Sequence, residues 1–254
     1  MMSSHSSISM SSATGKQILS LIRNGDYAHA GEEEAIRLTL EGITPCHDRQ
    51  VLDMGCGLGG TADYIARLGL GRLTGIDIDH DTISYATKRY PSHTFACGPA
   101  EEASRHLQPG FSLVVIFNAL YAFPNQIGAL REAHTLAAPE GELRIFEYTA
   151  ASETPAVKAF CERYGRGRWR PVMVDQSTEM FSEAGWNLDT VTDLTPQYES
   201  WYSDLVRKIQ SKQAEIVSHH GEQWFDYALR RYQELLDVIQ QGIIGGAIFK
   251  ATRV

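Results

Sequence analysis

Three glycines near residue 55 stand where a ligand could approach the backbone closely. Gly55, Gly57 and Gly59 follow an apolar run that ends at Met54, and a helical pattern begins directly after them. Glycine lets the backbone turn tightly against a bound molecule, because a Cβ atom at these positions would collide. The spacing therefore predicts a ligand held between a strand and a helix.

An acidic residue lies at the distance expected for a partner of this turn. Asp77 ends the next apolar run, about 20 residues after Gly55, and this separation is typical of a carboxylate that accepts hydrogen bonds from a ribose. The turn and the acid together predict a cofactor that contains a nucleoside.

Two classes of cofactor fit this pattern. Gly55, Gly57 and Gly60 satisfy the G-x-G-x-x-G spacing of dinucleotide-binding turns. Asp53, two residues before the first glycine, would repel a pyrophosphate at the following helix but attract the ammonium group of S-adenosylmethionine (SAM). We therefore favour SAM, and NAD(P), FAD or an ordinary tight turn remain the alternatives.

The sequence around the turn alternates between strand-like and helical patterns. This alternation predicts a parallel sheet covered by helices on both faces. A long helical block at Pro196–Gln241 predicts a cap inserted before the final strand. The strand-like runs are Gln50–Met54, Arg72–Asp77, His93–Cys97, Phe111–Phe117, Glu142–Glu147, Trp186–Thr192 and Gly246–Ala251.

The segment Val51–Thr61, taken with Asp77, resembles motif I and the following acidic motif of class I SAM-dependent methyltransferases. The resemblance covers Gln50 to Val254 in order. It implies an α/β fold with a Rossmann-like, seven-stranded, mostly parallel sheet whose last strand is antiparallel. We expect three parts: a disordered tail at 1–14, an N-terminal helical lid at 15–48, and a methyltransferase domain at 49–254 with a helical cap at 195–241.

The resemblance also implies which residues hold SAM. The glycine turn would line the methionine end, Asp77 would hold the ribose, and Ile78 would lie beside the adenine. Gly98 stands where this family often has an acid, which leaves a backbone contact from Pro99 or Ala100. The predicted cofactor-binding residues are Tyr27, Asp53, Gly55, Cys56, Gly57, Gly59, Asp77, Ile78, Gly98, Pro99, Ala100 and Asn118.

A narrower resemblance involves small-molecule N-methyltransferases. The segments Asp26–Glu32, Asp193–Trp201 and Gly245–Arg253 are similar to parts of the phosphoethanolamine and sarcosine/dimethylglycine enzymes, the first of them to their N-terminal lid. Asn118 and Ala122 stand where phosphoethanolamine enzymes carry an aspartate and a catalytic histidine. This departure argues against a phosphorylated base as the substrate.

Three side chains are predicted to serve the methyl acceptor. Tyr121 and Tyr148 follow predicted strands, and ligands of open α/β sheets bind at the carboxyl ends of the strands. His29, in the predicted lid, could act as a base. We predict these three as the catalytic residues, with aromatic packing and a structural histidine as the alternatives.

Charge and composition limit the partners. The formal net charge is −8, which argues against a nucleic-acid surface or an electrostatic membrane anchor. The notable basic cluster is Arg166, Arg168 and Arg170, which could bind a carboxylate or phosphate or form a solvated loop. The four cysteines lack the spacing of a zinc site or a disulfide scaffold.

These features predict a cytoplasmic enzyme that transfers a methyl group from SAM to a small-molecule amine or hydroxyl. We expect no metal, nucleic-acid or membrane partner, and we leave a homodimer open. A SAM-binding regulatory protein without transfer activity and a dinucleotide-dependent oxidoreductase remain the alternative functions.

Overall fold

An eight-stranded sheet organises the chain in the computed structural model, which describes residues 8–165 and 168–254. The strands follow the order β3-β2-β1-β4-β5-β8-β7, and β6 pairs with β5 beside this path. Their bounds are β1 Gln50–Met54, β2 Arg72–Asp77, β3 Thr94–Cys97, β4 Phe111–Phe117, β5 Ala137–Ala150, β6 Val172–Met173, β7 Trp186–Asp193 and β8 Gly245–Arg253.

The sheet is parallel from β3 to β5, and its last strand runs the other way. β8 is antiparallel to both of its neighbours, β5 and β7, whereas the pairs from β1 to β5 are parallel. The predicted Rossmann-like α/β fold with an antiparallel last strand is therefore confirmed. The short β6, which pairs Val172 with Thr149, had no predicted counterpart because two residues carry no periodicity.

The strands form where apolar residues run without interruption. β4 is buried from Leu113 to Phe117, as expected for a strand covered on both faces. β5 begins before the predicted Glu142–Glu147, because Ala137 already pairs with Phe111 before the register shifts.

Helices cover both faces of the sheet. Residues of α1, α2, α3, α8 and α10 pack on one face, and residues of η1, α5 and α7 pack on the other. In the described residues, no helix combines the length and the apolar character that crossing a bilayer would require. The helices are α1 Ala13–Arg23, α2 Glu32–Thr39, α3 Gly60–Arg67, α4 His80–Arg89, η1 Ala100–Arg105, η2 Leu120–Ala122, α5 Gln126–Leu136, α6 Pro155–Gly165, η3 Val174–Gln176, α7 Ser177–Glu183, α8 Thr195–Ser211, α9 Gln213–His220 and α10 Glu222–Gln240.

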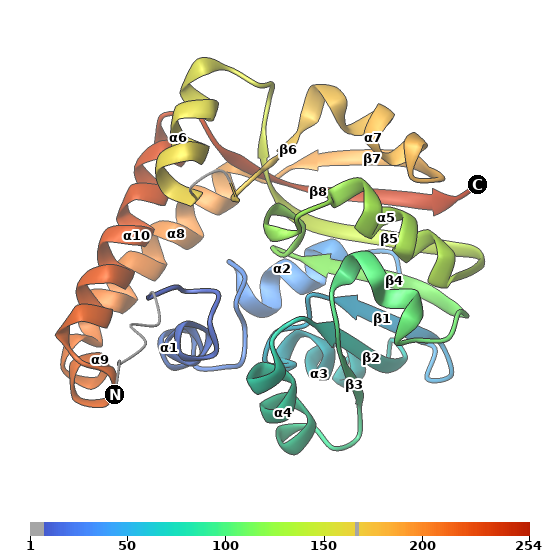
Figure 1. Ribbon diagram of the computed structural model, residues 1–254, viewed down its shortest axis with the longest axis horizontal. Helices are drawn as coiled ribbons and strands as arrows, with labels where there is room; N and C mark the ends of the chain where they lie inside the picture. The colour runs from blue at the N-terminus through green and yellow to red at the C-terminus, as the bar shows by residue number, and fades with distance from the viewer. Residues whose placement is uncertain (1–7, 166–167) are drawn as a thin grey trace, which may run out of the picture.

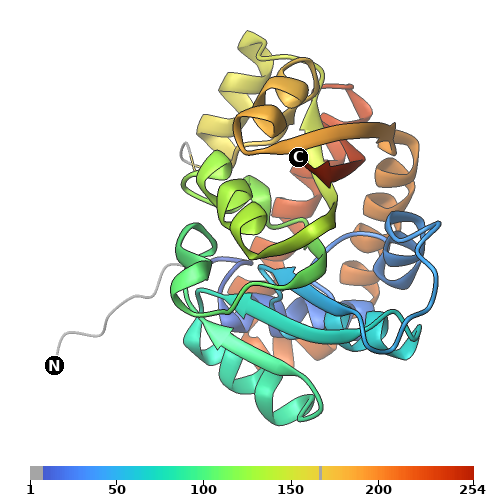
Figure 2. The same cartoon turned by 90° about the vertical axis from the view of Figure 1, so that its right-hand side faces the viewer.

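The helical block before the last strand consists of three helices, α8, α9 and α10. α10 begins after Gly221, whose φ of +89° suits glycine. α8 and α10 pack along each other, and α1 packs against α8. Figure 1 shows these helices opposite the carboxyl ends of β1 and β4, and in Figure 2 the orange and red helices lie behind the strands. The cap therefore faces the end of the sheet where ligands of this fold bind.

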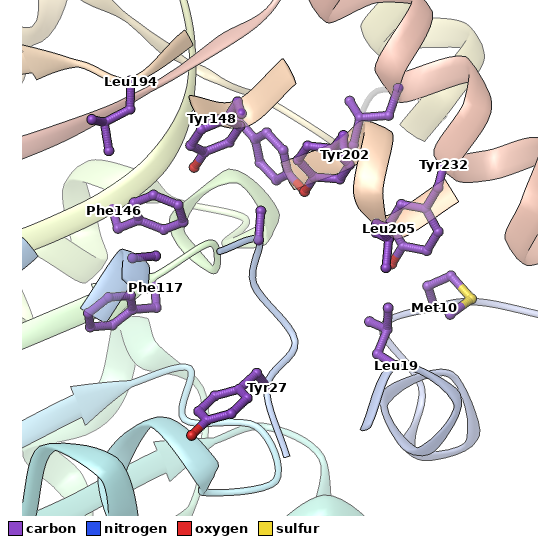
Figure 3. Packing of buried hydrophobic residues seen from close by; sticks show 14 of the residues in the cluster. Met10, Leu19, Tyr27, Phe117, Phe146, Tyr148, Leu194, Tyr202, Leu205 and Tyr232 are labelled. Atoms are coloured by element: carbon purple, nitrogen blue, oxygen red, sulfur yellow. The ribbon is translucent and has the colours of Figure 1, made fainter. Parts of the chain in front are cut away.

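Residues 8–14 depart from the predicted disordered tail, whose residues 1–7 lie outside the described part of the chain. Met10 is 8% exposed and lies beside Leu19 of α1 (Figure 3). Ser12 caps α1 by accepting a hydrogen bond from Gly15 N at 3.2 Å. The packing of Met10 and the hydrogen bond of Ser12 at the start of α1 order this segment, although its serine-rich composition suggested the opposite.

Candidate active site

A cavity of about 870 Å³ lies at the carboxyl ends of the parallel strands. Its walls come from the turn after β1, the ends of β2, β3 and β4, the residues before and within α1, and Tyr148 and Tyr232. The volume and the position are those of a ligand site in an open α/β sheet.

The structure brings most of the predicted site residues to this cavity and leaves five elsewhere. The predicted residues that line it are Gly55, Gly57, Asp77, Ile78, Gly98, Pro99, Ala100, Asn118, Tyr121 and Tyr148. The predicted residues outside the lining are Tyr27, His29, Asp53, Cys56 and Gly59.

The glycine turn has the backbone conformation that its sequence requires. Gly55, Gly57 and Gly59 have φ values of +81°, +54° and +88°, which L side chains rarely adopt. A Cβ atom at Gly57 would meet no atom within 4 Å, whereas one at Gly59 would lie 2.9 Å from the Phe95 ring. Gly57 thus leaves cavity space for a ligand, and Gly59 lets the turn pack against β3.

Asp77 connects this turn to the end of β2. Its Oδ2 accepts hydrogen bonds from Gly57 N and from Lys16 Nζ, each at 3.0 Å. Its Oδ1 accepts one from Asp79 N, also at 3.0 Å. The carboxylate is 9% exposed and faces the cavity at the position predicted for the ribose.

Asp53 places a second buried carboxyl group near Asp77. It is 1% exposed, and its Oδ2 has no hydrogen-bond partner in the described structure. Burial, followed by the negative charge of Asp77, raises the pKa of Asp53 to about 7. A buried acceptor without a partner favours a cationic or hydrogen-donating ligand group nearby.

The residues after β3 form a wall suited to an apolar ring. Gly98, Pro99 and Ala100 line the cavity together with Ile78, whose side chain is 71% exposed. A Cβ atom at Gly98 would lie 2.5 Å from the His106 ring. A side chain at Gly98 would therefore require the exposed His106 ring to move.

The space at Gly57, the carboxylate of Asp77 and the apolar wall at Ile78 fit the groups of SAM, with Asp53 buried outside the lining. Asp77 would hold the ribose, Ile78 and the wall after β3 would hold the adenine, and the glycine turn would face the methionine part. Bound there, SAM supplies an electrophilic methyl group on a sulfonium.

Aromatic side chains form the other end of the cavity. The rings of Tyr121 and Tyr148 meet edge to face with centroids 5.1 Å apart, and Trp169 packs on both. The Tyr148 hydroxyl contacts that of Tyr202. Figure 3 shows Tyr148, Tyr202 and Tyr232 one after another in space, from the sheet to the cap. We call Asn118, Tyr121 and Tyr148 the acceptor wall.

The two tyrosines of the acceptor wall are poor bases and weak acids. Burial raises the pKa of both Tyr121 and Tyr148 above the usual range, and nearby tyrosines add to this effect. The charge of Glu147 raises the pKa of Tyr121 further. Both hydroxyls therefore stay protonated near neutral pH, and their chemistry is hydrogen bonding and packing.

Glu147 holds the acceptor wall from behind and was absent from the predicted site. It is fully buried. Its Oε1 accepts hydrogen bonds from Tyr148 N at 2.8 Å and Asn118 Nδ2 at 3.2 Å, and its Oε2 accepts one from Tyr121 N at 3.1 Å. Burial outweighs these hydrogen bonds and raises the pKa of Glu147 to about 7.

His29 lies behind the cavity and not in its lining. It is 2% exposed. Its Nδ1 donates to Ala30 O at 3.0 Å, and its Nε2 accepts from the Thr61 hydroxyl, also at 3.0 Å. Burial lowers the pKa of His29 to about 3, so a neutral, fully bonded ring replaces the base that we predicted.

Tyr27 also belongs to the packed interior. It is 7% exposed, its hydroxyl donates to Glu33 at 3.2 Å, and its ring lies apart from Tyr148 of the acceptor wall (Figure 3). The preceding Asp26 accepts hydrogen bonds from Ser20, Tyr85 and Tyr90. This turn is therefore anchored to α1, to α4 and to the residue after α4.

Gly60, the third glycine of the dinucleotide-like spacing, has a different role. A Cβ atom there would lie 2.6 Å from Asp26 O. The glycine is thus required by the close approach of the N-terminal segment, and this weakens the dinucleotide interpretation.

Several lining residues had no signal in the sequence. Lys16 and Tyr232 reach the cavity through contacts between segments distant in the chain, which local patterns do not reveal. Arg168 and Arg170 of the basic cluster also line the cavity, whereas Arg166 lies outside the described residues. The lining residues missed by sequence reasoning include Ser9, Met10, Ser11, Ser12, Lys16, Leu19, Phe117, Phe123 and Tyr232.

Comparison with known sequences identifies the part of the chain around the glycine turn. Residues 51–141 match the family described as a methyltransferase domain. The chain is 24% identical to 27-O-demethylrifamycin SV methyltransferase of Amycolatopsis mediterranei over 215 residues, which are 80% of this chain and 78% of that protein.

Comparison with solved structures extends the similarity to nearly the whole chain. Phosphoethanolamine N-methyltransferase 2 of Haemonchus contortus, in complex with phosphomonomethylethanolamine and S-adenosylhomocysteine, has a TM-score of 0.83 at 16% identity. The match covers 97% of this chain but 60% of that one. A cyclopropane synthase of Mycobacterium tuberculosis has a TM-score of 0.81 at 14% identity and is covered over 96% of both chains.

These findings confirm the resemblance drawn from the glycine turn, and they agree with SAM as the cofactor. Residues 51–141 match the methyltransferase-domain family, and nearly the whole chain has the fold of these SAM-dependent methyltransferase structures.

Proposed function

We propose that this chain transfers a methyl group from SAM to a small-molecule amine or hydroxyl. The observation that carries the proposal is the continuity of the cavity. The same cavity is lined by Asp77 and Gly57 at one end and by Tyr121 and Tyr148 at the other. A donor and an acceptor bound at these two ends would share one cavity, which is what an in-line transfer needs.

The chain's own residues would orient the acceptor and exclude water. The acceptor wall provides rings and hydroxyls held by packing and by Glu147. The described lining includes no histidine, and its lysine, Lys16, is already paired with Asp77. We therefore expect an acceptor that binds with its lone pair already free, such as a neutral amine, or one that loses its proton to water.

The charges at this end favour an acceptor with an acidic group. Arg168 and Arg170 line it, and arginine binds carboxylate and phosphate well. Relatives act on varied molecules: the Amycolatopsis protein is named for a demethylrifamycin, and the Haemonchus structure holds a phosphomonomethylethanolamine. The acceptor itself is best sought in a broad panel.

Two measurements test the proposal. Thermal unfolding should shift upward with SAM and S-adenosylhomocysteine (SAH) but not with NAD⁺, NADP⁺ or FAD, because a ligand of the native state stabilises it. Incubation with SAM and panels of amines, hydroxyls and their carboxylated or phosphorylated forms should then give a methylated product by mass spectrometry.

The outcomes separate the alternatives. A thermal shift with a dinucleotide alone would contradict the proposal. SAM binding without a product from any panel would favour the regulatory SAM-binding role.

A further inference from the structure

A lysine from the N-terminal helix occupies the carboxylate at the predicted ribose position. Lys16 Nζ donates to Asp77 Oδ2 at 3.0 Å and lies 3.5 Å from the Thr82 hydroxyl. The two side chains of the pair are 11% and 9% exposed. The pair joins α1 to the end of β2, and both residues line the cavity.

The hydrogen-bonding capacity of Asp77 is almost used up by its present partners. A carboxylate offers about four acceptor positions. Three are taken, by Lys16 Nζ, Gly57 N and Asp79 N. A ribose that donates both of its hydroxyls needs two positions, so one of the three partners has to leave.

Lys16 is the partner that can leave. Gly57 N and Asp79 N are backbone groups of two turns, and losing either would rearrange the cofactor site itself. The lysine ammonium is carried on a flexible four-carbon chain with three rotatable donors. We propose that Lys16 sets the affinity for the cofactor: its ammonium occupies Asp77 in the free protein, leaves when the ribose binds, and returns when the demethylated cofactor departs. The inference rests on the proposed function, since it takes Asp77 as the ribose partner.

The surroundings of Lys16 support such an exchange. A largely buried carboxylate without a cation is unfavourable, which gives the free protein a reason to keep the pair. Asp79 offers the ammonium a second position nearby. Burial opposes ionisation of Asp79, but the hydrogen bonds from Thr82 and the charge of Lys16 outweigh it and lower the Asp79 pKa. The ammonium can therefore move without losing a negative neighbour.

The exchange would ease release of the product. SAH keeps the ribose and the adenine of SAM, so the contacts that bind one also retain the other. A lysine that competes for Asp77 weakens the binding of both SAM and SAH, and it re-forms its ion pair with Asp77 as the product leaves. Ser9, Ser11 and Ser12 line the cavity just before α1, so movement of this segment would also widen the way out.

The test compares SAH binding by calorimetry in wild type, Lys16→Met and Lys88→Met. Lys88 is exposed on α4 and outside the cavity lining, so its variant matches the change in charge and side chain. We expect Lys16→Met to bind SAH about 3- to 10-fold more tightly than wild type and to unfold at a lower temperature without ligand. Lys88→Met should match wild type in both respects, and Lys16→Arg should bind like wild type.

Weaker or unchanged binding by Lys16→Met would overturn the inference, since weaker binding would mean that the lysine contacts the cofactor. If wild type itself shows no binding of SAH, the proposed function fails instead, so the two failures are distinguishable.

A second measurement uses the wild-type protein alone, in case the variant does not fold. Acetylation with acetic anhydride, followed by peptide mass spectrometry, reports the accessibility of each lysine. SAH should increase the labelling of Lys16 relative to Lys88. A decrease or no change on SAH binding would contradict the exchange.

Discussion

Asn118 donates its side-chain amide to the buried carboxyl group of Glu147, 3.2 Å away. Asn118 directly follows β4 and Glu147 lies within the neighbouring parallel strand β5. The same amide also donates to the Tyr198 hydroxyl of the cap at 3.0 Å. The hydrogen-bond donors to Glu147 in the described residues carry no charge, so a buried carboxyl group without a cation organises the acceptor wall.

Glu147 should make stability depend on pH in a specific direction. Because its pKa is raised from an ordinary 4.5 to about 7 in the folded protein, the folded state holds a proton between these values that the unfolded state has lost. Stability from this group therefore falls as pH rises from about 4.5 to 7 and is constant above. Denaturant unfolding should be measured for wild type and Glu147→Gln across this pH range. The free energy of unfolding of the variant should increase relative to that of wild type as pH rises.

If the difference in unfolding free energy between wild type and Glu147→Gln stays constant between pH 4.5 and 7, Glu147 keeps an ordinary pKa. SAH affinity serves as the control in this experiment, because the carboxyl group holds the acceptor wall and not the glycine turn, and it should stay within about twofold of wild type.

His29 should remain neutral throughout the range in which an ordinary histidine titrates. Burial lowers its pKa to about 3, and both ring nitrogens already have partners. In NMR spectra its ring signals should not move between pH 8 and 5. The contribution of His29 to the free energy of unfolding is complete above about pH 6.5 and is lost as pH falls toward 3. A midpoint near 6.5 for His29 would restore it as a candidate base.

A methyl group at Gly57 should block the cofactor more than it harms the fold. Gly57→Ala and Gly42→Ala both place alanine at a positive φ, +54° and +87°, where its Cβ meets no atom within 4 Å. The strain is therefore comparable, about 1–2 kcal/mol in unfolding free energy, but only Gly57 lines the cavity. SAH binding should weaken roughly tenfold or more in Gly57→Ala and stay unchanged in Gly42→Ala; equal binding by both variants would remove the turn from the site.

Asp77→Ala should weaken SAH binding by about 1–3 kcal/mol, because charge-assisted hydrogen bonds to the ribose are lost. Asp48→Ala provides the control, since Asp48 is also paired with a cation, Arg72, but its side chain is 85% exposed. Calorimetry that gives Asp77→Ala the affinity of wild type would exclude this carboxylate as the ribose partner.

The sheet and the cofactor turn could be predicted because their signals are local. β1, β2 and β4 begin and end at the predicted residues, since each is a short segment with apolar residues that lies between turn or helical patterns. The turn at Gly55 and the acid at Asp77 could likewise be recognised because their spacing in the sequence is typical of a nucleoside-binding site.

The N-terminal segment could not be predicted in the same way, because distant contacts decide its structure. The sequence Asn24-Gly25-Asp26 is typical of a flexible turn, but Ser20, Tyr85 and Tyr90 anchor Asp26. Lys16 and Asp77 are 61 positions apart, and no periodicity links them. Glu147 lies within an apolar strand, and its role depends on donors from β4 and η2.

The two ends of the cavity differ in charge, which gives the cavity a dipole. Asp77 and Asp79, with the cation of Lys16, line the cofactor end, and Arg168 and Arg170 line the acceptor end. A molecule with a separated positive and negative group would be turned by this field before it makes contact, and its association rate would fall as salt screens charges over about 8 Å. Uncharged molecules would enter at a rate that salt hardly changes, so the salt dependence of association can sort acceptor classes before any product is known.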